Sequence, residues 1–284
     1  MAARDTNGSA PSSRPGTALV TGASSGIGRE TARLLAEKGF CVFGTSRSDR
    51  PDFDSVRMLR LDVTSDASVA ACVDKVLDQV GTIDVLVNNA GTLHRGIAEE
   101  TALTEAAEVF DTNLFGAARV ANAVLPHMRE RGRGRIVNVG SLAAWVGEPG
   151  EGYYAASKAA LARHTEALRH EVRHRGVDVC LVEPGAFTTG VVEAATRSSG
   201  EIADYDQVRA SAFETLERGL RKGGDPRKAA EVVVKAATAR RSKPRYAAGS
   251  EALWLPPLRL LLPQWVLERL VRKGFGLPTA ATRG

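Results

Sequence analysis

Apolar and polar positions follow one another along this chain in blocks that predict strands and helices in turn. From Gly16 onward, short apolar runs are separated by longer segments in which apolar or small residues recur at helical spacing. Strands are predicted at 17–21, 40–45, 56–61, 83–87, 135–139 and 177–182. Helices are predicted at 27–39, 67–80, 104–131, 154–175 and 226–240, the last with Asp225 as N-cap and Pro226 at its first position.

The predicted strands are continuous apolar runs rather than apolar–polar alternations. Such runs are typical of a parallel sheet that is covered on both faces. Because strands and helices alternate along the chain, we expect an α/β fold with helices packed on each side of the sheet.

The two ends of the chain depart from this pattern. Residues 1–15 are small, polar and proline-containing, lack the apolar core of a signal peptide, and are predicted to be a disordered tail. Residues 250–284 form an extension in which Trp265, Val266, Leu270 and Val271 would make one helical stripe. This extension could cover a substrate pocket, pack at a subunit interface or lie on a membrane; we expect docking on the protein or at an interface.

Composition narrows the class of protein. Of 284 residues, 43% are hydrophobic, which is too many for a mostly disordered chain. The net charge of +5 is mild, and no basic run is interleaved with aromatic residues, so we expect no nucleic-acid partner. We also expect no transmembrane segment, because no apolar run is long enough.

Cysteine and histidine usage gives no sign of a metal site or a disulfide framework. The three cysteines, Cys41, Cys72 and Cys180, are widely spaced and odd in number. We therefore expect buried free thiols, a cytoplasmic location and no metal. The five histidines are scattered and do not form a ligand cluster.

A glycine-rich segment joins the first predicted strand to the first predicted helix. Glycines at this turn let the backbone approach a phosphate group, and the helix N-terminus supplies free N–H groups and a positive dipole end. The spacing Gly22-x-x-x-Gly26-x-Gly28 differs from the common dinucleotide fingerprint. A tight strand-to-helix turn is the structural alternative; position and composition together favour a dinucleotide pyrophosphate site.

The end of the second predicted strand distinguishes the two nicotinamide cofactors. An acid at this position holds the ribose of NAD, whereas an arginine accommodates the extra phosphate of NADP. The strand ends with Ser46 and Arg47, so no acid is present and a cation follows at once. A solvated surface arginine is the alternative, but the pattern favours NADP(H) over NAD(H).

Tyr154 and Lys158 are four residues apart in a predicted helix and so share one face. An ammonium group beside a phenol favours the phenolate and lowers its pKa, which would make Tyr154 a proton-transfer group near neutral pH. Ser141 follows a predicted strand, at the edge of the sheet where ligands bind. The structural alternative is that Tyr154 and Lys158 share a helix face by chance and have no catalytic role.

These features occur together and in a fixed order. The chain carries Thr21-Gly22-x-x-x-Gly26-x-Gly28, Asn88-Asn89-Ala90-Gly91, Asn113, Ser141, Tyr154-x-x-x-Lys158 and Pro184-Gly185. From about residue 16 to residue 249 this combination resembles the short-chain dehydrogenase/reductase family. The resemblance implies a single-domain, Rossmann-like, doubly wound parallel sheet of about seven strands, assembled as a homodimer or homotetramer.

The resemblance also implies roles for the site residues. Tyr154 would protonate the carbonyl oxygen in reduction and take the proton back in oxidation, and Ser141 would hydrogen-bond that oxygen. Lys158 would hold the nicotinamide ribose and depress the pKa of Tyr154, and Asn113 would support a water-linked proton relay. The implied cofactor contacts are Gly22, Ser24, Ser25, Gly26, Ile27, Gly28, Ser46, Arg47, Asp62, Val63, Asn89, Ala90, Gly91, Tyr154, Lys158, Pro184, Gly185, Phe187 and Thr189.

The segment after Pro184 bears on the substrate. It resembles the branch with hydroxysteroid and retinol dehydrogenases and related bacterial ketoreductases. Residues 186–224 would then form a lid of two helices around a break at 198–200, and its apolar side chains would suit a hydrophobic ketone or secondary alcohol; ordinary packing of a surface segment is the structural alternative. These side chains are Val191, Val192, Ile202, Tyr205 and Phe213, joined by Trp145, Val146 and Gly147 after Ser141.

Two functions therefore follow from the sequence. The first is an NADP(H)-dependent oxidoreductase acting on a small-molecule carbonyl compound or secondary alcohol. The alternative is a catalytically silent cofactor-binding regulator or scaffold of the same fold, because a fold alone does not establish turnover. Ser141, Tyr154 and Lys158 favour the enzyme, since a pure binder needs no proton donor there.

Overall fold

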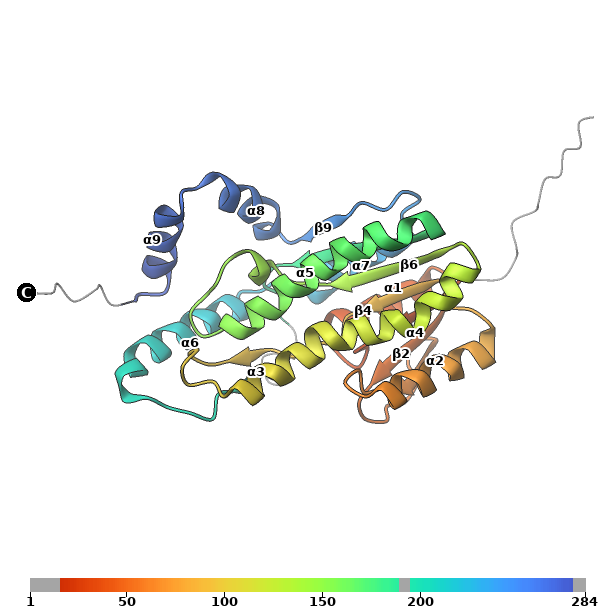
Figure 1. Ribbon diagram of the computed structural model, residues 1–284, viewed down its shortest axis with the longest axis horizontal. Helices are drawn as coiled ribbons and strands as arrows, with labels where there is room; N and C mark the ends of the chain where they lie inside the picture. Colours follow the sequence, from red (N-terminus) through yellow and green to blue (C-terminus); the bar gives the residue numbers. More distant parts are fainter. Residues whose placement is uncertain (1–15, 189–194, 278–284) are drawn as a thin grey trace, which may run out of the picture.

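A computed structural model describes residues 16–188 and 195–277 (Figure 1). The predicted tail at 1–15 lies outside the described residues, as do Thr189, Val191 and Val192. The described strands are β1 (Thr17–Val20), β2 (Cys41–Ser46), β3 (Val56–Arg60), β4 (Val85–Asn88), β5 (His94–Arg95), β6 (Gly134–Val139), β7 (Val177–Pro184), β8 (Thr196–Arg197) and β9 (Arg245–Ala248). The described helices are α1 (Gly26–Glu37), α2 (Asp66–Val80), α3 (Leu103–Phe110), α4 (Gly116–Glu130), α5 (Gly152–Val172), α6 (Asp206–Arg221), α7 (Pro226–Thr238), α8 (Glu251–Leu261) and α9 (Gln264–Gly274).

Seven of these strands form one parallel sheet in the order β3-β2-β1-β4-β6-β7-β9. The chain starts in the middle of the sheet, moves outward to β3, then returns past β1 and builds the other half. The order therefore reverses beside β1, and in open α/β sheets the ligand crevice lies at such a reversal. The predicted doubly wound parallel sheet is confirmed.

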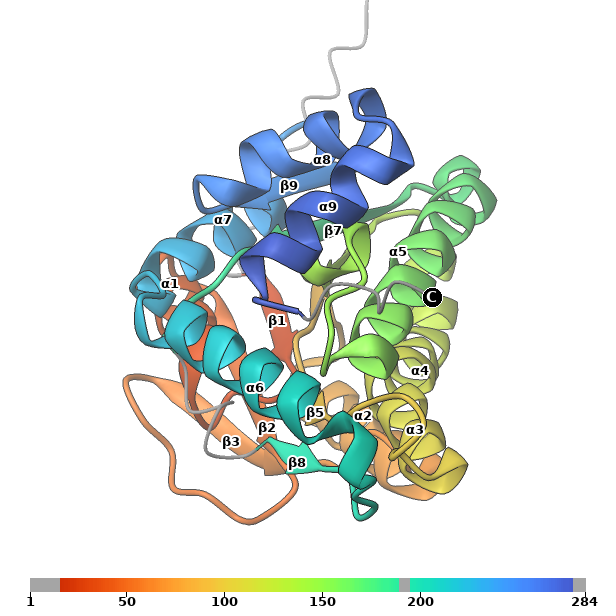
Figure 2. The ribbon, with the colours of Figure 1, turned by 90° about the vertical axis from the view of Figure 1, so that its left-hand side faces the viewer.

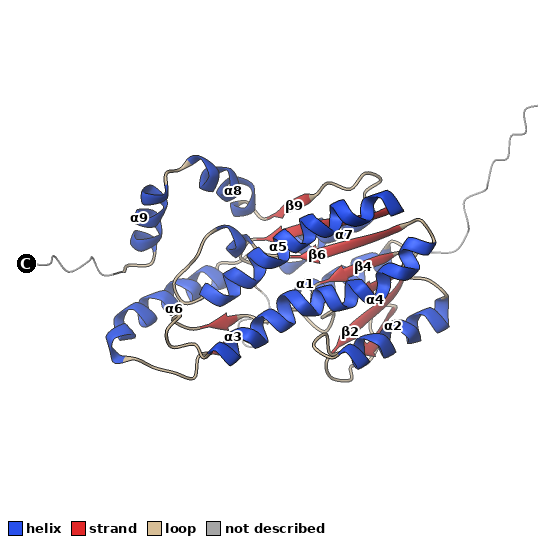
Figure 3. Cartoon of the chain, viewed as in Figure 1, coloured by secondary structure: helices blue, strands red, loops and turns tan. Residues whose placement is uncertain are grey.

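Helices cover both faces of this sheet, as the alternation of elements predicts (Figure 3). Helices α1 and α7 pack on one face, where Leu35 and Val233 join the core. Helices α2, α4 and α5 cover the other, where Val73 and Val124 are buried. Successive side chains of a strand point to opposite faces of the sheet. Leu19 and Val20 of β1 are therefore buried in the hydrophobic cores on opposite faces.

Three segments differ from the sequence prediction. The helix expected at 104–131 contains a π-helical turn at Asp111–Phe115 between α3 and α4. Of the two helices expected within 186–224, the described residues contain α6, preceded by a single 3-10 turn at Ala203–Tyr205. The residues before that turn include the strand β8, which pairs with β5 far away in the sequence, and pairing of this kind is not visible in local periodicity.

The C-terminal extension forms α8 and α9, which lie with α6 at one end of the molecule (Figure 2). Of the stripe predicted on α9, Trp265 and Leu270 are 68% and 50% exposed in the single chain. Leu267 and Phe275 are buried instead, and Val271 packs with Phe275 against α6. The extension therefore packs on α6 through Val271 and Phe275, while an interface role for Trp265 and Leu270 stays a prediction.

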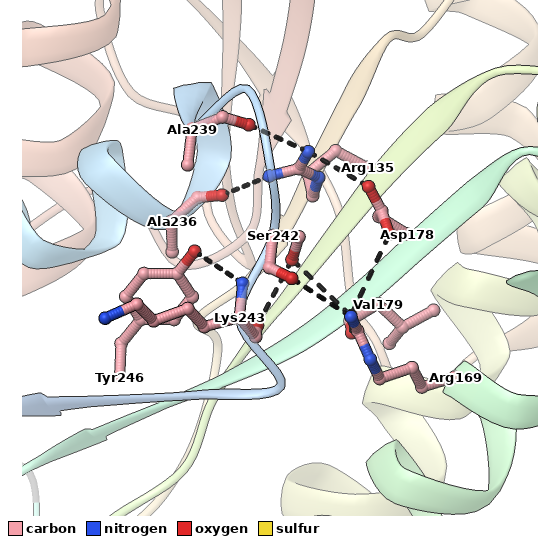
Figure 4. Close-up of polar contacts among 9 residues, drawn as sticks. All are labelled: Arg135, Arg169, Asp178, Val179, Ala236, Ala239, Ser242, Lys243 and Tyr246. Carbon is pink, nitrogen blue, oxygen red and sulfur yellow. Dashed lines mark hydrogen bonds and ion pairs between the residues drawn. The ribbon is translucent and has the colours of Figure 1, made fainter.

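Two arginines, Arg135 and Arg169, bind backbone carbonyl groups near the first residues of β6 and β7 (Figure 4). The Arg135 guanidinium donates to the carbonyl oxygens of Ala236 at 2.6 Å and Ala239 at 3.1 Å, and to the Asp178 carboxylate at 3.2 Å. It therefore caps the C-terminal end of α7, where carbonyl groups lack partners within the helix. Arg169 of α5 donates to the carbonyl oxygens of Val179 at 2.5 Å and Ser242 at 3.0 Å.

We predict that Arg135→Ala lowers the free energy of unfolding by about 2 kcal/mol, because it leaves buried carbonyl groups without donors. Chemical denaturation checks this value. Cofactor affinity should stay at the wild-type level, because Arg135 lies at the opposite end of its strand from the cavity described below. A variant as stable as the wild type would contradict the capping role.

Candidate functional site

A cavity of about 1560 Å³ opens at the carboxyl ends of the central strands. Its wall includes the β1–α1 loop and the residues after β2, β4, β6 and β7. Residues of α5, α6 and α8 close the remaining sides. Pockets for one small ligand typically measure about 300 to 1,000 Å³, so this cavity has room for a dinucleotide and a second molecule.

The glycine-rich loop forms one wall of the cavity. Its predicted contact residues all line the cavity, and they are Gly22, Ser24, Ser25, Gly26, Ile27 and Gly28. Gly22 and Gly26 have φ angles of +66° and +55°, which side chains other than glycine rarely adopt. Helix α1 begins at Gly26 without a side-chain cap, so the N–H groups of its first turn remain available to a ligand.

The loop is held against the end of β4 by Thr21 and Asn89. The Asn89 amide nitrogen donates to the carbonyl oxygens of Thr21 at 3.0 Å and Gly22 at 3.1 Å. A Cβ atom on Gly28 would lie 2.3 Å from that same amide nitrogen and from the Gly22 carbonyl oxygen. The structure thus gives the Asn89 side chain a positioning role, while Asn89, Ala90 and Gly91 also line the cavity.

The end of β2 carries the positions that distinguish the cofactors. Ser46 is buried, Arg47 is exposed, and both line the cavity together with Arg50, which the sequence analysis did not single out. Nothing in the sequence pattern marked Arg50, because it lies in an irregular segment beyond the strand.

Asp62 and Val63 follow the next strand, β3. Val63 lines the cavity, and Asp62 does not. The Asp62 carboxylate accepts hydrogen bonds from the backbone N–H of Thr64 at 3.0 Å and from its hydroxyl at 2.8 Å. These bonds, with the nearby guanidinium groups of Arg47 and Arg119, lower the pKa of Asp62. The adenine contact expected at Asp62 stays a prediction.

Ser141, Tyr154 and Lys158 meet in the cavity. Ser141 follows β6, and Tyr154 and Lys158 lie one turn apart on α5. The Lys158 ammonium is 5.9 Å from the centre of the Tyr154 ring and donates to the Val139 carbonyl oxygen at 3.2 Å. The structure therefore brings the three residues together from two elements, at the carboxyl edge of the sheet.

The pKa values in this group differ from the sequence expectation. Loss of solvent around the hydroxyl group raises the pKa of Tyr154 to about 12; a hydrogen bond with Ser141 opposes this rise and the Glu151 carboxylate adds to it. Burial lowers the pKa of Lys158 to about 8. The expected depression of the tyrosine pKa is therefore not found: desolvation dominates, and Tyr154 is protonated at neutral pH.

Asn113 lies beside this group but not in the cavity wall. Its side-chain oxygen accepts from the backbone N–H of Thr92 at 2.8 Å, and its amide nitrogen donates to the Thr92 carbonyl oxygen and the Ser157 hydroxyl, both at 3.0 Å. It sits in the π-helical turn between α3 and α4. The contacts of Asn113 join this turn to α5 and to the loop after β4.

The remaining predicted contacts lie after β7. Pro184, Gly185 and Phe187 line the cavity. Thr189 lies outside the described residues.

The cover of the cavity differs from the predicted one. Ile202, Tyr205 and Phe213 do not line it; the Tyr205 hydroxyl donates to the Glu99 carboxylate at 2.5 Å instead. Trp145, Val146 and Gly147 are also outside the wall, and the Trp145 indole donates to Glu183 at 2.8 Å. The lining side chains of α6, α8 and the segment after α9 are Thr215, Leu216, Leu220, Glu251, Trp254, Leu255 and Phe275.

Within residues 16–188 and 195–277, no cluster of histidine, cysteine or acidic side chains has the arrangement of a metal site. Cys72 and Cys180 are buried free thiols, and Cys41 is a half-buried one. In the same residues, no helix is long and apolar enough to cross a membrane.

Comparison with known proteins places the chain in a family. A model described as short chain dehydrogenase matches residues 16–200. A relative named 3-ketodihydrosphingosine reductase, from Bacteroides thetaiotaomicron, is 39% identical over 224 residues, which cover 78% of this chain and 83% of the relative.

Solved structures agree in fold. A short-chain dehydrogenase from Streptomyces avermitilis superposes with a TM-score of 0.78 at 35% identity and covers 92% of this chain and 97% of its own. A short chain dehydrogenase/reductase from Burkholderia phymatum, solved in complex with NAD, gives a TM-score of 0.74 at 25% identity, with 95% and 98% covered. This chain belongs to the short-chain dehydrogenase/reductase family, and it is an oxidoreductase of carbonyl and alcohol groups that binds a nicotinamide dinucleotide.

We predict that Gly28→Ala weakens binding of the nicotinamide dinucleotide and lowers the free energy of unfolding by about 2 kcal/mol, because its Cβ atom would force the loop away from Asn89. Calorimetric titration and thermal denaturation measure the two effects. Gly274→Ala is the control, because its Cβ atom would meet open space. Wild-type binding and stability in the Gly28 variant would contradict the proposed close contact.

Proposed function

We propose that the protein is an NADP(H)-dependent reductase of a hydrophobic ketone, with Tyr154 as the proton donor. The observation that carries the proposal is the convergence of Ser141, Tyr154 and Lys158 on the cavity that the glycine-rich loop also lines. A proton donor beside a dinucleotide cradle is the chemistry that carbonyl reduction requires.

The cradle fits a dinucleotide. A Cβ atom would fill the space at Gly28, and the first turn of α1 offers uncapped N–H groups to a pyrophosphate. When bound, the nicotinamide supplies the hydride. The residues of this chain supply orientation and the proton.

Tyr154 and Ser141 act on the carbonyl oxygen in this mechanism. The Tyr154 phenol, with a pKa of about 12, is protonated at neutral pH and donates its proton as negative charge develops on the oxygen. Ser141 contacts the tyrosine hydroxyl and donates a second hydrogen bond to the same oxygen. A neutral phenol suits the direction of reduction.

Lys158 and Asn113 support the proton donor. The Lys158 ammonium, buried and close to the tyrosine ring, stabilises the phenolate left after proton transfer and holds the ribose hydroxyls. Asn113 holds α5 through its hydrogen bond to Ser157, which supports the role proposed for it in a water-linked proton relay to Lys158.

Arg47 and Arg50 support the preference for NADP(H). Both line the cavity after β2, and a guanidinium group matches a phosphate with paired hydrogen bonds. No carboxylate follows directly on this strand to hold the ribose of NAD(H).

The apolar part of the wall supports a hydrophobic substrate. The cavity that Ser141, Tyr154 and Lys158 line is also lined by Leu216 and Leu220 of α6, Trp254 and Leu255 of α8, and Phe275. A relative named 3-ketodihydrosphingosine reductase also supports a ketone as the substrate.

The organisation of the chain follows the same proposal. Residues 16–249 form the dinucleotide-binding and catalytic domain, with 186–224 as the substrate cover, and 250–284 pack on the domain or at a subunit interface. We further propose a cytoplasmic homodimer or homotetramer without a nucleic-acid partner.

A catalytically silent cofactor-binding regulator is the competing function, and it is disfavoured because Ser141, Tyr154 and Lys158 remain grouped in the cavity.

We predict that Tyr154→Phe retains NADPH binding but loses turnover of ketones by about a hundredfold or more, because it removes one hydroxyl group and little volume. NADPH oxidation over a panel of ketones measures the loss. Tyr153→Phe is the matched control, since the neighbouring hydroxyl does not line the cavity. Comparable rates in Tyr154→Phe and wild type would remove the proton-donor role, and no turnover by wild type despite tight NADPH binding would favour the regulator.

We predict that Arg47→Ala raises the Kd for NADPH roughly tenfold and leaves the Kd for NADH close to the wild-type value, because NADPH alone carries the additional phosphate. Fluorescence titration measures both constants. Arg60→Ala, an exposed arginine outside the cavity, serves as the control. An equal effect on both cofactors would show that Arg47 does not contact that phosphate.

A further inference from the structure

Arg95 of β5 is a buried cation that the proposed reaction does not use. The residue is 2% exposed, and it does not line the cavity. Among the described residues, the Nε and Nη2 atoms of its guanidinium group have no hydrogen-bond partner. Because a buried charge costs stability unless it is paired, the ion pairs of Arg95 are the contacts that account for its position.

These ion pairs join two different parts of the cavity wall. The Nε atom of Arg95 is 3.8 Å from the Glu151 carboxylate, which lies at the N-cap of α5, three residues before Tyr154. The Nη1 atom of Arg95 is 3.5 Å from the Glu217 carboxylate of α6. Arg95 therefore connects the helix that carries the catalytic tyrosine to the helix that covers the cavity.

The pairing of β5 with β8 brings a second guanidinium group to Glu217. Arg95 and Arg197 are register partners in this two-stranded parallel sheet. Nη1 of Arg95 and Nη2 of Arg197 lie 3.5 Å and 3.6 Å from the same carboxylate oxygen of Glu217. The Arg197 side chain is 63% exposed, so solvent screens its contact more than that of the buried Arg95.

Helix α6 also packs on the backbone just before α5. A Cβ atom on Gly150 would lie 3.3 Å from Cδ1 of Leu216. The Gly150 carbonyl oxygen accepts a hydrogen bond from the backbone N–H of Gly96, the residue after Arg95, at 2.8 Å. Leu216 lines the cavity and directly precedes Glu217, so a displacement of Glu217 would move a side chain of the cavity wall.

The two helices differ in their packing. Helix α5 packs on the sheet, where Leu168 joins one of the two large hydrophobic cores. The buried residues of α6, Ala212 and Leu216, belong to a separate small cluster with Phe275. The position of α6 relative to α5 therefore depends on polar contacts to a greater extent.

A second polar contact holds the first turn of α6. Arg209 pairs with the buried carboxylate of Glu100, which also accepts a hydrogen bond from the backbone N–H of Ile202 at 2.9 Å. Arg209 precedes the cavity-lining residues of α6, whereas Arg95 pairs with Glu217 in their midst. Arg95 is thus placed to control the part of α6 that forms the cavity wall.

The titration of Glu151 agrees with this geometry. Burial and the neighbouring Glu148 raise the pKa of Glu151 to about 7, and Arg95 opposes the rise. Loss of the Arg95 charge would favour protonation of Glu151, so it would not leave an unpaired buried carboxylate. We therefore expect Arg95→Met to fold.

We propose that Arg95 is a positioning residue that holds the cavity-lining part of α6 against the start of α5, and that it thereby sets the affinity for substrates long enough to reach Leu216 and Leu220. This inference rests on the proposed reductase function. Arg95 acts through Glu217 and Glu151, because it does not line the cavity itself. A ketone that occupies only the space beside the catalytic group does not depend on it.

The kinetic test compares two methyl ketones, butanone and methyl heptyl ketone. Arg95→Met keeps a long side chain and removes the charge; it should raise KM for the longer ketone about tenfold. KM for butanone, and kcat for both ketones, should stay within about twofold of wild type. Glu217→Gln should raise KM for the longer ketone about threefold, because its contact is partly exposed. Glu214→Gln, on the exposed face of α6, is the matched control.

A double variant separates a shared contact from independent damage. Arg95→Met and Glu217→Gln remove the two sides of one ion pair, so the double variant should have the same KM for the longer ketone as Arg95→Met alone. Multiplication of the two single effects would overturn the proposed contact.

Hydrogen exchange gives a readout that needs no turnover. In the NADPH-bound protein, the amides of residues 206–221 should exchange about tenfold faster in Arg95→Met, and about threefold faster in Glu217→Gln, than in wild type. Exchange in α5 should not change, and Glu214→Gln should behave as wild type. Glu217→Gln keeps the test decisive if Arg95→Met does not fold.

The outcomes separate this inference from the function on which it rests. Wild-type KM and exchange in both single variants, or an equal loss of kcat/KM for the two ketones, would overturn the positioning role and leave the reductase intact. Reduction of neither ketone by wild type would count against the reductase, and the exchange of α6 would then decide the role of Arg95.

Discussion

The contact between the glycine-rich loop and the end of β4 is the constraint on which the geometry of the cavity depends. Asn89 donates to two carbonyl oxygens of the loop, and Thr21 accepts from the backbone N–H groups of Asn89 and Ala90 at 3.0 Å each. These bonds fix the start of α1 relative to the point where the strand order reverses. Because Gly28 lacks a side chain, the loop and β4 approach closely enough to form one continuous wall.

The chemistry of the site depends on desolvation in that cavity. The same loss of solvent that keeps Tyr154 protonated lowers the pKa of Lys158 to about 8 and raises that of Glu151 to about 7. One desolvated environment thus produces a protonated phenol, a cation next to it and a carboxylate that ionises near neutral pH. The cost of burying these groups is offset by the two hydrophobic cores on either face of the sheet.

Much of the fold and of the cofactor side was predictable from the sequence. Apolar runs mark buried parallel strands, and Gly22, Gly26 and Gly28 mark the loop, because these features depend on local sequence. A cover within 186–224 was predictable, but the side chains of α6 that line the cavity and the β5–β8 pairing were not, because each depends on residues far apart in the chain. Asp62 stays a predicted cofactor contact; its carboxylate accepts hydrogen bonds from Thr64, and spacing alone does not reveal such bonds.

The central claim is that this cavity transfers a hydride to a carbonyl carbon while Tyr154 protonates the oxygen. The most direct measurement is mass spectrometry of the alcohol formed from a turned-over ketone with NADPH deuterated at the transferable position of the nicotinamide. The account predicts one deuterium, bonded to the carbinol carbon. An alcohol without deuterium, or binding of NADPH with no alcohol formed from any hydrophobic ketone, would contradict it.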